Sequence, residues 1–181
     1  YFNYQGKVFR WNRESSGPVG RLSTEGLDKV FDLFSKEIGS SNNANFLKNL
    51  FEYAYLKHSN LADATRFLAN EIFQNEGLVI IDGDAVALKK LFIPFVKKEL
   101  LEQTSFKKVS ETNELLKDYF VQVNPREINL FYLSETRNRI EFNGGKYSVV
   151  DTDISFSETE LLEELENYPE NFSPNALMRP V

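Results

Sequence analysis

The chain has 181 residues, 41% of them hydrophobic and 14% aromatic, which is enough material for the core of one domain, or of one domain with a small annex. Its formal net charge of −6 argues against a nucleic-acid or anionic-membrane partner, because both need a basic protein surface. The absence of cysteine excludes disulfides and thiolate metal sites, and no apolar run approaches the ~20 residues of a transmembrane helix. We therefore expect a cytoplasmic protein with no nucleic-acid and no membrane partner.

Residues 1–22 are predicted to form short strands. Apolar and polar side chains alternate loosely around a turn at Gln5 and Gly6, a pattern typical of a hairpin. A loop follows, and Pro18–Leu22 is predicted to add one further short strand.

Residues 23–124 are predicted to be mainly helical, because apolar side chains recur at steps of three and four residues. The exception is the segment 78–82, where a run of β-branched residues between helices predicts a strand buried on both faces. Pro94 should kink or restart the helix that contains it. The predicted helices cover about residues 24–38, 42–55, 61–72, 85–101 and 105–121.

Residues 125–181 are predicted to form a strand, a hairpin and a helix. The strand covers 128–133, and Asn143-Gly144 supplies the positive φ that a tight hairpin turn between 139–142 and 147–150 needs. Ser157–Glu160 is a capping box that begins a short helix. The last residues, Ser173–Val181, read as a turn that leads into an unfinished apolar strand.

These elements predict an α/β fold of the mixed α+β kind, in which helices accompany a small mixed sheet and β-hairpins. Because the final strand is unfinished and residue 1 is Tyr rather than Met, we expect the 181 residues to be a piece of a longer protein.

The sequence contains few residues suited to metal or nucleophilic catalysis. His58 is the only histidine, and without cysteine or a second histidine it predicts neither a metal site nor a histidine-dependent triad. The sequence also has two groups of charged residues: three lysine doublets (89–90, 97–98 and 107–108) and eight carboxylates between residues 151 and 170. Ordinary solvated helix faces are the favoured interpretation of both groups, and a partner-docking surface is the alternative.

Two groups of polar residues lie where a buried element begins or ends. Arg126 comes just before the predicted strand 128–133, while Ser173, Asn175 and Arg179 belong to the terminal segment. An arginine on an apolar strand must be paired or must reach solvent. If it points into a cleft, it can bind a carboxylate or phosphate through two parallel hydrogen bonds; the alternative is a structural ion pair.

Four regions of the chain carry a pattern that is more specific in combination than any one region is alone. Phe172–Val181 reads FSPN-x-x-x-RP, and the other three are Gly17–Arg21, Gly77–Asp82 with Ala87–Phe92, and Pro125–Leu133. In this order and separation they resemble the bacillithiol biosynthesis cysteine-adding enzymes, a family of cysteine ligases. The resemblance covers nearly the whole chain.

The resemblance implies a larger cytoplasmic enzyme with a Rossmann-like core and a C-terminal helical coiled-coil domain, of which this chain is the middle or connecting part. The enzyme would add cysteine to glucosaminyl-malate through an amide bond, so its small-molecule partners are cysteine and glucosaminyl-malate. For the full-length enzyme the resemblance leaves open a nucleotide cofactor, ATP or ADP, and a homodimer; no cofactor is evident in these residues. The His-Gly-His-type signature of the related synthetases is missing, so the chain alone is expected to be inactive.

The resemblance also implies roles for the candidate residues. Ser173, Asn175 and Arg179 would lie at the edge of a ligand cleft, where Arg179 binds an anionic group of substrate or nucleotide and Asn175 orients it. Arg126 is a further candidate. The alternative class is a non-catalytic protein-interaction module that docks a partner through the acidic segment 151–170 or the lysine doublets.

Overall fold

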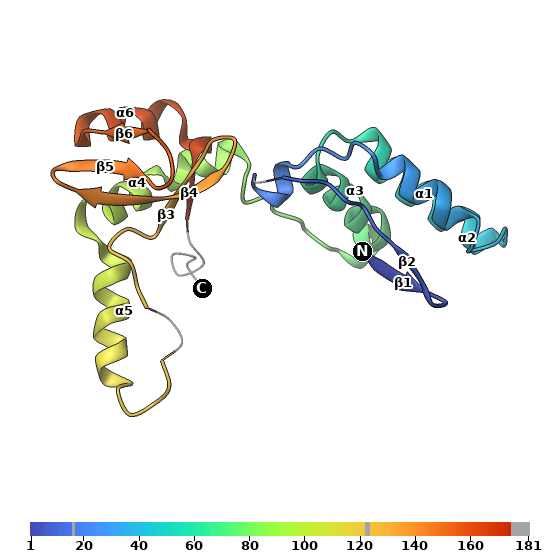
Figure 1. Ribbon diagram of the computed structural model, residues 1–181, viewed down its shortest axis with the longest axis horizontal. Coiled ribbons are helices and arrows are strands. Elements are labelled where there is room, and N and C mark those ends of the chain that lie inside the picture. The colour runs from blue at the N-terminus through green and yellow to red at the C-terminus, as the bar shows by residue number, and fades with distance from the viewer. Residues whose placement is uncertain (16, 122–123, 175–181) are drawn as a thin grey trace. The chain divides into compact units, whose positions relative to one another are not determined.

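The computed structural model describes residues 1–15, 17–121 and 124–174 (Figure 1). The chain divides into two compact units, Tyr1–Asp82 and Gly83–Val181, which we call unit 1 and unit 2. The division falls inside the region 23–124 that the sequence predicts as one helical stretch. Among the described residues, no helix is both long enough and apolar enough to cross a membrane.

Unit 1 consists of a short hairpin followed by helices. Strand β1 pairs antiparallel with β2 across Gln5 and Gly6, whose φ angles of 48° and 79° make the tight turn, so the predicted hairpin is confirmed. Asn60 caps α3, because its side-chain oxygen accepts from the Asp63 amide. The elements of unit 1 are β1 (Phe2–Tyr4), β2 (Lys7–Phe9), a 3-10 turn (Val19–Arg21), α1 (Leu27–Ser35), α2 (Asn42–Lys57), α3 (Leu61–Phe73) and a second 3-10 turn (Gln74–Glu76).

Aromatic rings and small residues hold unit 1 together. Phe34 of α1 meets Tyr4 and Phe9 of the hairpin edge-on, at ring-centre distances of 5.5 and 5.2 Å. Helices α2 and α3 pack against each other, and each buries an alanine completely, Ala54 and Ala64. Small side chains allow two helix backbones to approach closely, so this pair of helices needs few large buried residues.

Two predicted strands of the N-terminal half are wrong. Residues 19–21 form a 3-10 turn, in which the Arg21 amide donates to the Pro18 carbonyl at 3.0 Å. Residues 78–82 form no strand, and Val79 and Ile81 are 82% and 75% exposed. A β-branched run favours extended backbone, but a buried strand also needs neighbouring strands, and the described residues supply none here.

Unit 2 is a five-stranded sheet with helices. The strand order is β6-β5-β4-β3-β7, and every pairing among the described residues is antiparallel, so the expected mixed sheet is wrong. Helix α4 continues through Pro94 without a restart. The elements are α4 (Val86–Glu102), α5 (Thr104–Leu115), β3 (Leu130–Leu133), β4 (Arg137–Asn143), β5 (Lys146–Val149), β6 (Ser155–Phe156), α6 (Glu158–Asn167), a 3-10 turn (Pro169–Asn171) and β7 (Phe172–Pro174).

The core of unit 2 lies between one face of this sheet and helices α4 and α6. Alternate strand residues such as Leu130, Tyr132 and Phe172 are buried in one cluster with Leu100 of α4 and Leu161 of α6. The predicted hairpin is confirmed, but its positive φ angles of 60° and 83° belong to Gly144 and Gly145, because Asn143 is the last residue of β4 and pairs with Lys146. The capping box that begins α6 is confirmed too, because Ser157 and Glu160 satisfy each other's backbone amides.

Candidate functional site

The second face of the unit 2 sheet carries the polar side chains. Ser173 of β7 lies opposite Phe131 of β3, and Phe131 lies opposite Arg139 of β4. Directly opposed residues of an antiparallel sheet project from the same face, and neighbouring strands are about 4.8 Å apart. Ser173, Phe131 and Arg139 therefore form one row across three strands, away from the core that Phe172 and Tyr132 enter.

Two guanidinium groups lie against the ring of Phe131. The central carbon of the Arg137 guanidinium is 3.4 Å from the ring centre, and that of Arg139 is 5.1 Å away. Stacking on an aromatic face holds a guanidinium in place while its N–H groups stay directed outward in the plane. We call Phe131, Arg137, Arg139 and Ser173 the arginine face.

Arg126 borders a pocket that extends from the arginine face. The pocket has a volume of about 350 Å³, and both Arg126 and Arg139 line it, together with two carboxylates, Glu127 and Glu141. Arg126 is exposed, as an arginine that precedes an apolar strand must be unless it is paired. Arg139 is thus the residue that connects the predicted candidate Arg126 with the predicted candidate Ser173.

A buried hydrogen-bond network fixes the backbone at Arg126. Glu99 of α4 is 1% exposed, and its carboxylate accepts from the Ser105 amide at 2.9 Å and from the Asn129 amide at 3.2 Å. The side-chain amide of Asn129 donates to Glu99 and to the Arg126 carbonyl, the latter at 3.2 Å. One carboxylate therefore joins the start of α5 to the segment that enters β3.

A second polar cluster attaches α6 to the sheet on the core side. The Tyr132 hydroxyl donates to Glu164 at 2.7 Å, and the Asn171 amide donates to the same carboxylate oxygen at 2.8 Å. Burial, and then the hydrogen bond to Glu164, raise the pKa of Tyr132 to about 12. This cluster positions α6 rather than facing a ligand.

The other predicted candidates fall in different places. Asn175 and Arg179 lie outside the described residues, beyond Pro174 at the end of β7. The Nδ1 atom of His58 lies 2.8 Å from the Ala54 carbonyl oxygen, and the His58 ring packs beside Phe67, so it belongs to the helix packing of unit 1. Among the described residues, no group of three metal-ligating side chains lies together.

Lysines of α4 contact groups of their own unit. Lys89 is 9% exposed and binds Asp84 at 2.6 Å and the Glu170 carbonyl at 3.0 Å. Lys97 forms an ion pair with Glu166 of α6. Part of the surface proposed for partner docking is thereby used inside unit 2, which weakens the interaction-module alternative.

Sequence reasoning missed Phe131, Arg137 and Arg139 as site residues. The strand 139–142 was predicted, but the side chains that share a face with Ser173 depend on which residues pair between β3, β4 and β7. The available signal was the alternation of Arg137 and Arg139 with buried Ile140, which already separates two faces of β4.

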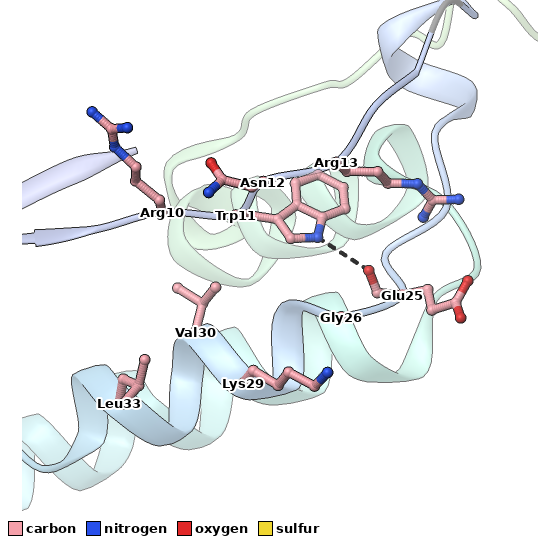
Figure 2. A pocket seen from close by; sticks show the side chains of 9 residues that line it. All are labelled: Arg10, Trp11, Asn12, Arg13, Glu25, Gly26, Lys29, Val30 and Leu33. Carbon is pink, nitrogen blue, oxygen red and sulfur yellow. Dashed lines mark hydrogen bonds between the residues drawn. The ribbon is translucent and has the colours of Figure 1, made fainter.

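Unit 1 contains a separate pocket between the loop after β2 and the start of α1 (Figure 2). Its volume is about 430 Å³. The Trp11 indole N–H donates to the Glu25 carbonyl at 3.1 Å, and Arg13 donates to the Ser23 carbonyl at 3.0 Å. Gly26 has a φ of 85°, a conformation that side-chain-bearing residues rarely adopt, and it lies beneath the indole.

Comparison with known proteins gives one consistent family. Residues 1–181 match the model of the "Bacillithiol biosynthesis BshC, N-terminal Rossmann-like domain". This description corrects the expectation that the chain is a middle or connecting part. The described part of the unit 2 sheet is antiparallel, so it does not itself show the parallel arrangement of a doubly wound sheet.

Relatives that carry the name "Putative cysteine ligase BshC" include proteins of three organisms that differ widely in their identity to this chain. The protein of Flavobacterium johnsoniae is 64% identical over 182 residues, which cover 100% of this chain and 34% of the relative. That of Salinibacter ruber is 31% identical over 93% of this chain and 32% of its own length. That of Bacillus mycoides is 27% identical over 95% of this chain and 33% of its own length. The chain thus spans about a third of the length of these curated relatives.

Proposed function

The chain belongs to the BshC family of bacillithiol biosynthesis, and we propose that it contributes a substrate-binding surface to a cysteine ligase that joins cysteine to glucosaminyl-malate. In this reaction the amine of the glucosaminyl group and the carboxyl group of cysteine form an amide, with the loss of one water overall. The enzyme must hold both molecules so that the nitrogen lies next to the carboxyl carbon.

The arginine face is the observation that supports this proposal. The malate portion of glucosaminyl-malate carries two carboxylates, and a guanidinium binds a carboxylate through two parallel N–H···O bonds. Arg139 stacks on Phe131 in the same row as Ser173 and lines the pocket beside Arg126. A dicarboxylate placed there would meet Arg126 and Arg139, in a pocket that Glu127 and Glu141 also line.

We propose the following roles for the candidate residues. Arg179 binds an anionic group, Asn175 orients it, and the Ser173 hydroxyl adds a hydrogen bond from β7. Arg126 contributes from the pocket side. The backbone at Arg126 is supported by Asn129 and Glu99, so its loop has a fixed starting point.

A nucleotide, ATP or ADP, is a proposal for the whole enzyme rather than for these residues. Phosphates are usually held by a glycine-rich loop between a strand and a helix. Before α4 the sequence has Asp82-Gly83-Asp84, which places two carboxylates where phosphates would bind, and in the described residues no strand lies between the 3-10 turn Gln74–Glu76 and α4. We therefore derive no step of the reaction through a nucleotide.

We expect the 181 residues alone to be inactive, and the whole enzyme to act in the cytoplasm. The chain lacks the His-Gly-His-type signature, and it spans about a third of the relatives' length. Turnover of cysteine and glucosaminyl-malate by these residues alone would contradict this expectation.

The experiment that tests the assigned role is Arg179→Ala in the full-length enzyme. We expect weaker binding of the anionic substrate and slower cysteine addition, because a charge-assisted bond is lost. Lys98→Ala is the matched control, since Lys98 is exposed on α4 and lies 4.0 Å from Glu102. If Arg179→Ala left substrate affinity and cysteine addition unchanged, the assignment would be wrong.

A further inference from the structure

The pocket of unit 1 has an aromatic wall and an aliphatic floor. Figure 2 shows the Trp11 indole above the start of α1, while Val30 and Leu33 project from the helix toward the loop. The indole is fixed by its hydrogen bond to the Glu25 carbonyl, which faces it across the pocket entrance. A flat molecule could lie beside this ring and against the apolar side chains of α1, since the volume of about 430 Å³ is within the range of small-molecule pockets.

Cations surround this apolar slot. Arg10, Arg13 and Lys29 line the pocket, against the one carboxylate of Glu25. Arg10 extends on one side of the indole and Arg13 on the other (Figure 2). Neither Arg10 nor Lys29 forms an ion pair with any residue in the described part of the chain. In a chain whose net charge is −6, a local excess of positive charge favours an anionic partner.

We propose that this pocket binds a small organic anion that carries a carboxylate or phosphate on a flat, aromatic body. The body lies against Trp11 and Val30, and the anionic group meets Arg13 and Lys29. The two parts are needed together, because surface cations alone bind anions weakly in water and an open apolar slot alone has no charge preference. This inference concerns unit 1 and does not rest on the proposed function of the arginine face.

The chain offers a direct probe of this site. Trp11 is the only tryptophan of the 181 residues, so tryptophan emission reports the pocket without other signals. Benzoate and phenyl phosphate supply a ring with an anion, benzamide supplies the ring without charge, and inorganic phosphate supplies the charge without a ring. We expect saturable changes of emission with benzoate or phenyl phosphate, and binding at least about tenfold weaker for benzamide and inorganic phosphate.

Two substitutions test the cations, and Lys29→Gln is the one that separates binding from folding. Arg13→Gln should weaken the better probe by at least about fivefold, although it also removes the bond to the Ser23 carbonyl. Lys29→Gln should weaken it by at least about threefold, and Lys29 is an exposed helix residue whose replacement leaves the fold intact. Lys98→Gln, at an exposed position of α4 in unit 2, is the control and should leave the emission response unchanged.

The outcomes decide between the proposal and its alternatives. A stronger response to carboxylate than to phosphate, or the reverse, identifies the anionic group. The proposal is overturned if neither aromatic anion gives a saturable response, if benzamide binds as well as benzoate, or if both Arg13→Gln and Lys29→Gln bind like the unchanged chain.

Discussion

Unit 1 and unit 2 bury their side chains in different ways. Unit 2 has a continuous core, in which Leu130, Ile140, Leu161 and Phe172 are each 2% exposed or less. In the described part of unit 1, the buried hydrophobic residues are Phe9 and Leu50, which are 7% and 8% exposed, and the fully buried Ala54 and Ala64. Since buried apolar area is the main source of stability, unit 2 should be the rigid part on which a binding site can be built.

This difference also indicates which unit can hold a binding site in a fixed geometry. A residue on a strand of a packed sheet is held by its neighbours on both sides, so the arginine face has a defined geometry. The pocket of unit 1 depends on a loop held by the two hydrogen bonds from Trp11 and Arg13. We therefore assign the substrate surface of the ligase to unit 2 and a separate ligand site to unit 1.

The largest effect is expected in the unit 2 core. Phe172→Ala should lower the free energy of unfolding of unit 2 by about 3–5 kcal/mol, because it leaves a cavity beside Tyr132. Phe46→Ala in unit 1 is the control and should cost less than about 1 kcal/mol, since Phe46 is 64% exposed. Hydrogen exchange of peptides from each unit measures both changes in unfolding free energy. Equal losses in the two variants would contradict the difference in core packing between the units.

The buried network below Arg126 should give the next largest effect. Glu99→Gln places an N–H₂ group among N–H donors, and we expect unit 2 to lose about 2–3 kcal/mol of unfolding free energy. Glu102→Gln on the same helix should change it by less than about 0.5 kcal/mol, because Glu102 is exposed. Denaturant unfolding of the two variants makes the test, and indistinguishable midpoints would show that Glu99 does not hold the network.

The alkaline pH dependence of unit 2 should depend on Tyr132. Its pKa is about 12 in the fold and about 10 in an unfolded chain, so the neutral hydroxyl is the favoured form in the folded state. This stabilisation is complete below about pH 10 and is lost as the pH rises from about 10 to 12, by on the order of 2 kcal/mol. Tyr132→Phe should remove this contribution to the loss of unfolding free energy between pH 10 and 12. The free energy of unfolding of both proteins, measured between pH 8 and 12, tests this expectation. If it fell equally with pH in both proteins, Tyr132 would not be the group responsible.

Helix capping should distinguish the units by a smaller amount. Ser157 in unit 2 belongs to a reciprocal capping box, whereas Ser41 in unit 1 accepts a single bond from the Ala44 amide. Ser157→Ala should therefore cost about 1–2 kcal/mol and Ser41→Ala about 0.5–1 kcal/mol. Thermal unfolding of the two variants provides the measurement. A larger loss for Ser41→Ala would reverse the ranking.

Local signals explain what the sequence predicted correctly. The hairpin after Asn143 and the Ser157–Glu160 box each depend on residues within a few positions of one another, so their chemistry is visible in the sequence, although the positive φ angles belong to Gly144 and Gly145. The predicted strand at 78–82 is wrong because strand formation requires a pairing partner elsewhere in the chain. The apolar run itself does not show whether such a partner exists.

The candidate site was predictable only in part, because strand pairing, which the sequence does not show, decides which side chains lie together. Ser173 and Arg126 were identified from their positions at the ends of elements, and both lie near Arg139. Arg139 itself was missed, because its place beside Phe131 follows from the pairing of β3 with β4. Asn175 and Arg179 stay predictions, since they lie outside the described residues.

The role of the arginine face is tested most directly by steady-state kinetics of the full-length enzyme with Arg139→Ala. We expect a KM for glucosaminyl-malate at least about tenfold higher, with the KM for cysteine and the melting temperature nearly unchanged, because one charge-assisted carboxylate contact is lost. Lys98→Ala should leave all three values unchanged. An unaltered KM for glucosaminyl-malate in the Arg139→Ala enzyme would contradict the assignment of the arginine face to the substrate.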